Sequence, residues 1–326
     1  MLQEISVKRP LPNNLKKEHL PLFQDSLEET FTRLHPVYLK NAWVIQDTIF
    51  SPGELKFYSS RTHIEALGPL QFAKRAVYCA PKSWRRVDKG MWVLDEWSHN
   101  YFHWITDCLP RIWEGLEKDT DFPVILPSSM MSLPYVVDSL NLLGVKYISF
   151  SPRENLRVDT LILTARTAPY PQFNIPLVKK TREKLSLTSG NPTTRKVYIS
   201  RSKAPKRKVS NEPDVERLLI LRGFEIIHAE DLSFKQQIQL MAETRLLVSL
   251  HGAALTNMIF LPEGARVLEL RNEGDSISQC YFNLASALDI PYFYTLNKGS
   301  EKATILADFE IDLQALEQAL EAMEAN

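Results

Sequence analysis

Titratable side chains recur at helical spacing in the segment from Trp97 to Trp113, WSHNYFHWITDCLPRIW. Aromatic and aliphatic residues fill most of its other positions, which predicts a helix that is buried on most sides and has one polar edge. Residues four apart are neighbours along a helix face. Four residues follow that spacing and would form the polar edge: His99, His103, Asp107 and Arg111.

This edge suits acid–base chemistry better than metal binding. Asp107 beside His103 in a partly apolar setting could accept a proton, because such a setting raises a carboxylate's pKa. His99 and His103 have zinc-helix spacing and Asp107 could be a third ligand, but the segment lacks the Glu of H-E-x-x-H and no second ligand cluster stands out, so we expect no metal. A His–Asp pair that only satisfies itself in the core remains the alternative. Pro110 predicts a kink or an end of the helix, so Arg111 need not share the face of Asp107.

A second group of polar residues lies in the stretch 195–208, RKVYISRSKAPKRK, which holds seven basic residues and no acidic one. Arg201 falls where a predicted strand ends, and ligands of open α/β sheets bind beyond the carboxyl ends of strands. Guanidinium groups there would suit a phosphate or diphosphate. A solvated basic loop is the alternative. One isolated cluster without interleaved aromatic residues does not indicate nucleic-acid binding.

A third candidate is the turn after the buried strand 245–250, in RLLVSLHGAALTNMIF. A helix starting near Ala253 would offer free backbone N–H groups and a positive dipole end to an anion, and Gly252 would let a ligand approach closely. Neither G-x-G-x-x-G nor a P-loop is present. His251 is a candidate contact for a phosphate or sugar, and Glu269, at the end of the next strand, for a ribose or sugar hydroxyl. A structural histidine and a solvated carboxylate are the alternatives.

The composition indicates that any strongly charged binding surface is confined to such local clusters. The 326 residues include 39 Lys and Arg and 39 Asp and Glu, so the formal net charge is zero, which favours neither nucleic acid nor a membrane surface. Three cysteines without metal-ligand spacing predict no disulfide framework and a reducing compartment. The first twenty residues contain no apolar signal region, and no run approaches the roughly 20 apolar residues of a membrane helix. We therefore expect a cytoplasmic protein without an integral membrane segment.

Alternation of short apolar strands with helices predicts an α/β fold with parallel sheets covered on both faces. The pattern occurs in both halves, which favours two Rossmann-like domains facing a central cleft. We expect an N-terminal extension at 1–60 packed on a first domain at 61–170, and a second domain at 171–326 that ends in an amphipathic helix. A D-x-D match at 119–121 lies in a charged turn, and we do not interpret it as a metal motif. In the second half, the expected helices span 211–223, 233–244 and 276–289.

Three motifs in this order, NYFHWITDCLPR, YISRSKAPKRKVSNE and LVSLHGAALTNMIFLPEGARVLEL, resemble glycosyltransferase family 61. The resemblance runs from about Met91 to the terminal helix. This family includes bacterial capsular-polysaccharide enzymes, plant xylan xylosyl- and arabinosyltransferases, and animal O-linked N-acetylglucosaminyltransferases. It implies a GT-B fold and inverting transfer from a nucleotide sugar, usually a UDP-sugar, to a glycan hydroxyl without an essential metal. Surface polysaccharide biosynthesis, with peripheral association with an assembly complex, would fit.

The resemblance also implies roles for single residues. It places Asp107, our best candidate for the base, and His103 on the cleft side of the first domain. The donor side would consist of residues facing the diphosphate or lining its pocket: Ser200, Arg201, Arg207, His251, Gly252, Ala253 and Asn257. Ala254 stands where the family commonly has Gly. Two other functions stay open: a non-catalytic sugar-nucleotide or glycan-binding protein of the same fold, and a metal-dependent hydrolase built on His99, His103 and Asp107.

Overall fold

The computed structural model describes residues 2–64, 67–117, 121–187, 192–204, 206–275, 279–304 and 306–325 of the chain. It is an α/β protein whose chain divides into two compact units. The first unit comprises Met1–Ile5, Phe31–Pro169 and Pro176–Lys184, and the second comprises Ser6–Thr30, Tyr170–Ile175 and Leu185–Asn326. This division differs from the expected boundaries, because residues 6–30 of the expected extension belong to the second unit and residues 31–60 to the first.

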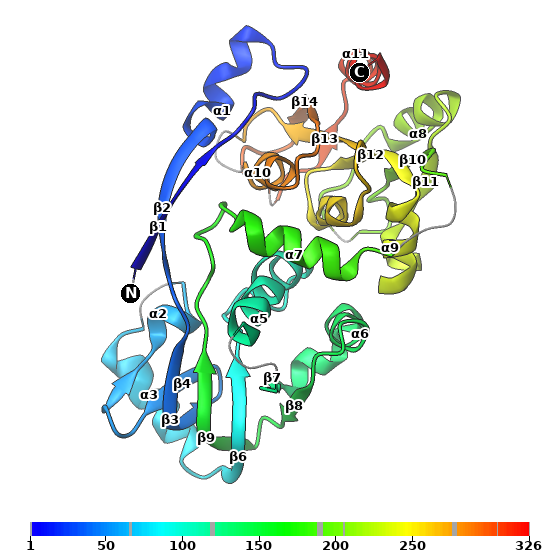
Figure 1. The fold of residues 1–326 in the computed structure, drawn as a ribbon. Helices are drawn as coiled ribbons and strands as arrows, with labels where there is room; N and C mark the ends of the chain where they lie inside the picture. Colours follow the sequence, from blue (N-terminus) through cyan, green and yellow to red (C-terminus); the bar gives the residue numbers. More distant parts are fainter. Residues whose placement is uncertain are drawn as a thin grey trace. The chain divides into compact units, whose positions relative to one another are not determined.

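The first unit is built on a seven-stranded sheet of order β5-β4-β3-β9-β6-β7-β8 (Figure 1). β6, β7, β8 and β9 pair in parallel, whereas β3, β4 and β5 form an antiparallel meander that joins β9. The strands are β3 (Val37–Ile45), β4 (Thr48–Ser51), β5 (Lys56–Phe57), β6 (Ser83–Trp92), β7 (Val124–Pro127), β8 (Tyr147–Phe150) and β9 (Glu154–Leu163).

The prediction of a purely parallel first sheet was therefore wrong. Only Gln46 and Asp47 separate β3 from β4, and Gln46 adopts a positive φ of 57°. A two-residue connection can join only antiparallel strands, because parallel strands need a long crossover. The segment expected to pack on the first domain instead supplies three strands of its sheet.

The polar segment of the first unit is one continuous helix with a wide turn in its middle. It begins as α4 (Tyr101–His103), where Asn100 accepts a hydrogen bond from the Phe102 N–H, and ends as α5 (Leu109–Leu116). Between them, residues Trp104–Cys108 form a π-helical turn in which the Leu109 N–H donates to the Trp104 carbonyl. The wide turn precedes Pro110, so the helix continues through a proline that would interrupt a regular α-helix.

Further helices of the first unit lie between its strands or, in the case of the last one, follow β9. They are α2 (Ser59–Thr62), α3 (Pro69–Cys79), the 3₁₀ helix η3 (Ser128–Ser132), α6 (Pro134–Leu142) and α7 (Ile175–Leu185). The core includes the carboxyl-terminal halves of β6 and β9, where Met91, Leu161, Ile162 and Leu163 are fully buried. Burial on both faces explains why these strand ends read as continuous apolar runs.

The second unit contains a six-stranded sheet of order β11-β10-β12-β13-β14-β15, parallel except for the edge strand β15. The predicted parallel sheet is thus present in this half. Its strands are β10 (Arg195–Ile199), β11 (Glu225–Ile227), β12 (Thr244–Leu250), β13 (Arg266–Asn272), β14 (Tyr292–Gly299) and β15 (Phe309–Glu310). β1 (Leu2–Lys8) and β2 (Glu28–Leu34) pair separately as a two-stranded sheet.

Helices of the second unit follow the sequence signals closely. Their bounds are η1 (Lys17–His19), α1 (Leu20–Leu27), α8 (Glu212–Leu221), η4 (Ala229–Asp231), α9 (Phe234–Ala242), η5 (Ala253–Phe260), α10 (Cys280–Ala287) and α11 (Leu313–Ala325). The Ser233–Gln236 capping box of α9 is present, and Gly223 ends α8 with a φ of 80°. Asn211 precedes α8 as expected, but its side chain makes no cap bond and instead binds the backbone of Ile311. The terminal helix α11 packs into the core through Leu316, Leu320 and Met323.

Of three further expectations, one is confirmed and two lie partly outside the described residues. The helix expected after Gly252 is present as the 3₁₀ helix η5, which begins at Ala253. The first residues of the helix expected at 276–289 and the first two of the D-x-D match at 119–121 lie outside the described parts of the chain. Within the described ranges, no helix is both long and apolar enough to cross a bilayer.

Candidate active site

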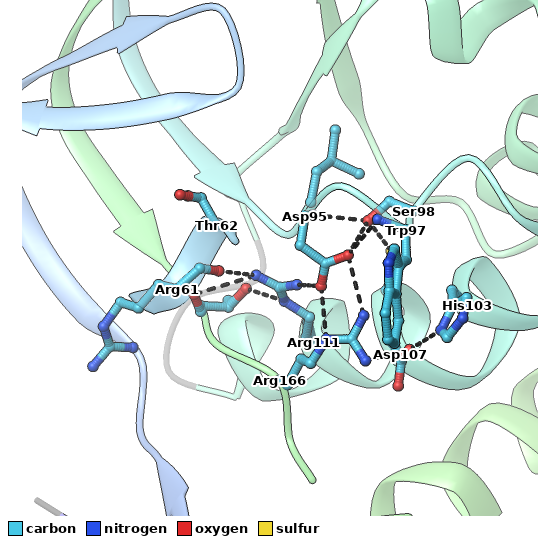
Figure 2. Close-up of polar contacts among 12 residues, drawn as sticks. Arg61, Thr62, Asp95, Trp97, Ser98, His103, Asp107, Arg111 and Arg166 are labelled. Atoms are coloured by element: carbon cyan, nitrogen blue, oxygen red, sulfur yellow. Dashed lines mark hydrogen bonds and ion pairs between the residues drawn. The ribbon is translucent and has the colours of Figure 1, made fainter. Parts of the chain in front are cut away.

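The first group of polar residues centres on a hydrogen-bonded pair, His103 and Asp107, in the first unit (Figure 2). His103 ends α4 and Asp107 lies in the π-helical turn, and Nδ1 of His103 is 2.7 Å from Oδ2 of Asp107. Both side chains are mostly buried, with 14% and 12% of their surface exposed. A carboxylate bound to Nδ1 fixes the imidazole so that Nε2 is its proton-accepting nitrogen. The predicted pair is therefore present and has a geometry suited to general-base chemistry.

Two residues that the sequence reasoning missed extend this pair into a network. The Arg166 guanidinium lies 3.4 Å from Asp107 and donates to both oxygens of Asp95, at 3.0 and 3.2 Å. Asp95 also accepts from Arg111 at 3.0 Å. Asp95 follows β6 and Arg166 follows β9, and these strands are parallel neighbours whose carboxyl ends meet. The order of contacts is His103–Asp107–Arg166–Asp95–Arg111, as Figure 2 shows.

Charge pairing sustains this buried network. Burial by itself lowers the pKa of the Arg166 guanidinium, but the carboxylates of Asp107 and Asp95 raise it above its usual value. For Asp95, burial raises the pKa, and the two guanidiniums of Arg111 and Arg166 outweigh that and hold it below its ordinary range. These opposite shifts favour the charged forms of Asp95 and Arg166, and the Arg166 guanidinium in turn lies beside the Asp107 carboxyl group.

The other two members of the predicted polar edge have separate partners. His99 Nε2 lies 3.3 Å from the Ser129 hydroxyl. Arg111 is fully buried and bonds to Thr164 and to the Arg61 carbonyl as well as to Asp95. The expected edge is thus only partly helical, because His99 precedes the Asn100 cap and lies outside the helix. No group of three or more His, Cys, Asp or Glu side chains able to hold a metal occurs among the residues that the structure describes.

The second group lies at one point of the second unit's sheet, between β10 and β12. The strands run in the spatial order second-first-third-fourth-fifth from β11 to β14. The chain order reverses between β10 and β12, and ligands of doubly wound sheets bind at the carboxyl ends of strands at such a switch point. Ser200 and Arg201 follow β10, and His251 and Gly252 follow β12. The structure thus brings two of the three sequence candidates together.

Two guanidinium groups converge on Gly252. A Cβ atom on this glycine would lie 2.9 Å from Nη1 of Arg201 and 3.6 Å from Nη1 of Arg207. Both arginines are held by backbone carbonyls: Arg201 donates to those of Lys206 and Arg207, and Arg207 donates to that of His251. Burial and the neighbouring charge of Arg207 both lower the pKa of Arg201.

No carboxylate lies within ion-pair distance of Arg201 or Arg207 in the described parts of the chain, whereas three other cations of this stretch are paired. Lys203 pairs with Asp231, and Arg195 pairs with Glu225 and Glu243. Two like charges held together without a counter-charge favour an anion between them, and two guanidiniums match the oxygens of a phosphate or diphosphate.

Behind this point lies a buried polar cluster centred on Glu269. Its carboxylate binds Nδ1 of His251 and the hydroxyl of Tyr292, and the Arg271 guanidinium lies 3.8 Å away. Burial raises the pKa of Glu269, but the charge of Arg271 and the two hydrogen bonds hold it below its ordinary value. Glu269 is fully buried, and its bond to Nδ1 positions the His251 ring.

The remaining candidates of the second unit lie around the two arginines. Ser200 is buried and donates to Glu212 of α8, which ties the strand end to that helix. Asn257 is also buried, and its amide donates to Gln237 of α9 at 3.0 Å. Ala253 is half-buried next to Gly252. Ser200 and Asn257 are therefore held by neighbouring helices, while the guanidiniums of Arg201 and Arg207 lie against the buried Gly252.

The fold is that of an α/β protein with a doubly wound parallel sheet in its second unit, where two guanidiniums meet at one strand end. The family model of Glycosyltransferase 61 matches residues 101–268, which is more than half of the chain and includes the His103–Asp107 pair, Arg201, Arg207 and Gly252. The chain belongs to this family.

Curated relatives match shorter segments. The EGF domain-specific O-linked N-acetylglucosamine transferase of Bos taurus is 30% identical over 116 residues, which cover 33% of this chain and 22% of the relative. The Xenopus laevis protein of the same name is 37% identical over 70 residues, covering 22% and 13%. Protein O-linked-mannose beta-1,4-N-acetylglucosaminyltransferase 2 of Bos taurus is 32% identical over 93 residues, covering 27% and 16%. The matches thus span less than a quarter of each of these relatives.

Proposed function

We propose that this protein transfers a sugar from a nucleotide sugar, with UDP as the carrier, to a hydroxyl group of a glycan acceptor. Family membership and relatives named for N-acetylglucosamine transfer support glycosyl transfer. A role in surface polysaccharide biosynthesis, peripheral association with a polysaccharide assembly complex and a cytoplasmic location belong to the same proposal. The reaction proposed is a direct displacement with inversion at the anomeric carbon and without a metal ion.

The observation that carries the proposal is the pair of guanidiniums at Gly252. In glycosyl transfer the bond between the anomeric carbon and the diphosphate breaks, and negative charge grows on the departing diphosphate. Arg201 and Arg207, fixed by backbone carbonyls and lacking a carboxylate partner within ion-pair distance in the described chain, are suited to stabilise that charge. Two such cations can do what a divalent metal does in metal-dependent enzymes, which supports metal independence.

In the proposed reaction the His103–Asp107 pair acts on the acceptor. The attacking hydroxyl must lose its proton as its oxygen bonds to the anomeric carbon, and a positioned side chain has to accept that proton. We assign this role to the pair, with Arg166 and Asp95 fixing the Asp107 carboxylate. A GT-B arrangement, in which the two units act on one donor and one acceptor, is part of the proposal.

A transfer assay with a panel of nucleotide sugars and glycan acceptors tests this function. We expect release of UDP that depends on the acceptor, persists in excess EDTA and yields a product of inverted anomeric configuration by NMR. Arg201→Ala should abolish turnover, whereas Arg217→Ala, an exposed arginine paired with Asp214, should not. Binding of nucleotide sugars without turnover on any acceptor would instead indicate a non-catalytic binding protein. Activity that is lost in EDTA and restored by a metal would contradict the metal-free mechanism.

A further inference from the structure

Helix α3 of the first unit turns apolar side chains toward solvent. Leu70, Val77 and Tyr78 are 69%, 75% and 58% exposed, although large hydrophobic residues of a helix normally face the core. Leu70, Ala73, Lys74 and Val77 are spaced three and four residues apart and therefore share one face, with Tyr78 at its border. We call Leu70, Ala73, Lys74, Val77 and Tyr78 the outer face of α3.

The opposite face of α3 already anchors the helix to its unit. The Phe72 ring stacks on that of Phe57 at 4.1 Å, and Arg75 forms an ion pair with Asp47. Cys79 is buried at the end of the helix, where its carbonyl accepts a hydrogen bond from Asn155. The helix is therefore docked by its inner side, and the outer face is not needed for the fold.

Charge indicates what the outer face contacts. The stretch from Pro69 to Val87 contains five basic residues and no acidic one, in a chain whose net charge is zero. Three of the five are paired with carboxylates inside the unit: Arg75, Arg85 and Arg86. Lys74 and Lys82 have no carboxylate within ion-pair distance among the described residues, and Lys82 lies 4.2 Å from the Tyr78 ring centre. Exposed apolar side chains beside two lysines that lack a carboxylate partner in the described residues are complementary to a surface with anionic groups on its outside and apolar groups beneath them.

We infer that the outer face of α3 docks this protein onto anionic lipid membranes. The apolar side chains would enter the interface, and Lys74 and Lys82 would contact lipid headgroups. A second copy of the chain fits less well, because two such faces would bring lysines of like charge together. This surface shares no residue with either polar group of the site, so the inference does not depend on the proposed transfer reaction.

Co-sedimentation of the full chain with vesicles tests the inference. We expect binding to vesicles of phosphatidylcholine and phosphatidylglycerol, weaker binding at high salt, and little binding to phosphatidylcholine alone. The double variant Leu70→Ser/Val77→Ser should lower the partition coefficient at least about tenfold, and Lys74→Gln/Lys82→Gln should remove the preference for anionic lipid. Leu221→Ser is the matched control, because Leu221 is 83% exposed on α8 in the second unit.

A fluorescent label reports the contact itself. All three native cysteines are buried, so a thiol-reactive dye should attach selectively to Val77→Cys or to the control Leu221→Cys. An environment-sensitive dye at position 77 should shift to the blue with anionic vesicles, and the dye at position 221 should not. Absence of vesicle binding at low ionic strength, or binding unchanged in both double variants, would overturn the inference. A dimer in solution that Leu70→Ser/Val77→Ser dissociates would also overturn it, since the face would then bind a second copy.

Discussion

Arg201 occupies the space in front of Gly252, where a Cβ atom would lie 2.9 Å from Nη1 of the guanidinium. The backbone of Gly252 is extended, with φ of 163°, a conformation that any residue can adopt. Glycine here leaves room for the close approach of Arg201, and no backbone strain calls for it. The end of β12 and the guanidinium that follows β10 thus form one continuous surface.

Replacing this glycine should separate ligand binding from stability. In Gly252→Ala the new methyl group would push the tips of Arg201 and Arg207 away, and we expect UDP affinity to fall about tenfold or more. The fold should tolerate the change, because the clashing atoms are the ends of flexible side chains. Calorimetric titration and thermal unfolding measure the two effects. Gly53→Ala, where the new Cβ would meet nothing within 4 Å, is the control. Unchanged UDP affinity in Gly252→Ala would remove Arg201 from the site.

Asp107→Asn tests the acid–base pair. The amide cannot support His103 as an ionised carboxylate does, so the transfer rate should fall by about 10²- to 10⁴-fold. UDP affinity should stay at the wild-type value, because the diphosphate site uses other residues. His99→Ala discriminates between mechanisms: a metal hydrolase would need His99, whereas the proposed transferase should retain its activity. A fully active Asp107→Asn enzyme would exclude the pair as the base.

Glu269 should contribute strongly to the stability of the second unit. Glu269→Ala would remove one carboxylate from beside the fully buried Arg271 and would also remove a partner of His251 and Tyr292. Breaking a buried pair in this way costs about 3–5 kcal/mol of the free energy of unfolding. Urea unfolding measures it. Asp214→Ala breaks the exposed pair with Arg217 and should cost less than about 1 kcal/mol. Equal effects of the two substitutions would refute the structural role of Glu269.

Glu114 should make the protein less stable as the pH rises toward neutrality. Burial raises the pKa of this carboxyl on α5 to about 7, although the Arg33 guanidinium 2.7 Å away acts to lower it. The folded state therefore binds the proton more tightly than the unfolded state, whose pKa is near 4.5. The stabilisation is complete below about pH 4.5 and is lost as the pH rises through about 7, a change of about 1–3 kcal/mol.

Glu114→Gln isolates this contribution from other titrating groups, because the amide keeps an acceptor for Arg33 but cannot ionise. The free energy of unfolding should fall less between pH 5 and pH 8 in Glu114→Gln than in the wild type. Identical pH dependence in the two proteins would show that Glu114 does not titrate in this range.

The sequence predicted the second unit better than the first, for a physical reason. Strands β10, β12 and β13 are buried on both faces and alternate with helices, so their apolar runs identify them directly. The Ser233 capping box in the same way marks the start of helix α9. In the first unit, β3 and β4 carry the same apolar signal, but nothing in a strand's composition states whether its neighbour is parallel. Only the two-residue connection at Gln46 and Asp47 carried that information.

Local spacing found the His103–Asp107 pair, since residues four apart meet within one helix. Asp95 and Arg166 are 71 residues apart and could be joined only through the pairing of β6 with β9. Both follow apolar strands in the sequence, which was a usable signal. The burial of Glu269 could not be predicted, because the residues that enclose it, His251, Arg271 and Tyr292, come from separate parts of the sheet.

Calorimetric titration of UDP in the presence of EDTA tests the central claim most directly. The wild-type protein should bind UDP without a metal, and Arg201→Ala and Arg207→Ala should each lose about ten- to a hundredfold in affinity, as expected when a charge-assisted hydrogen bond is removed. Arg217→Ala should bind as the wild type does. Absence of UDP binding in EDTA, or equal affinity in all four proteins, would contradict a metal-free diphosphate site at Gly252.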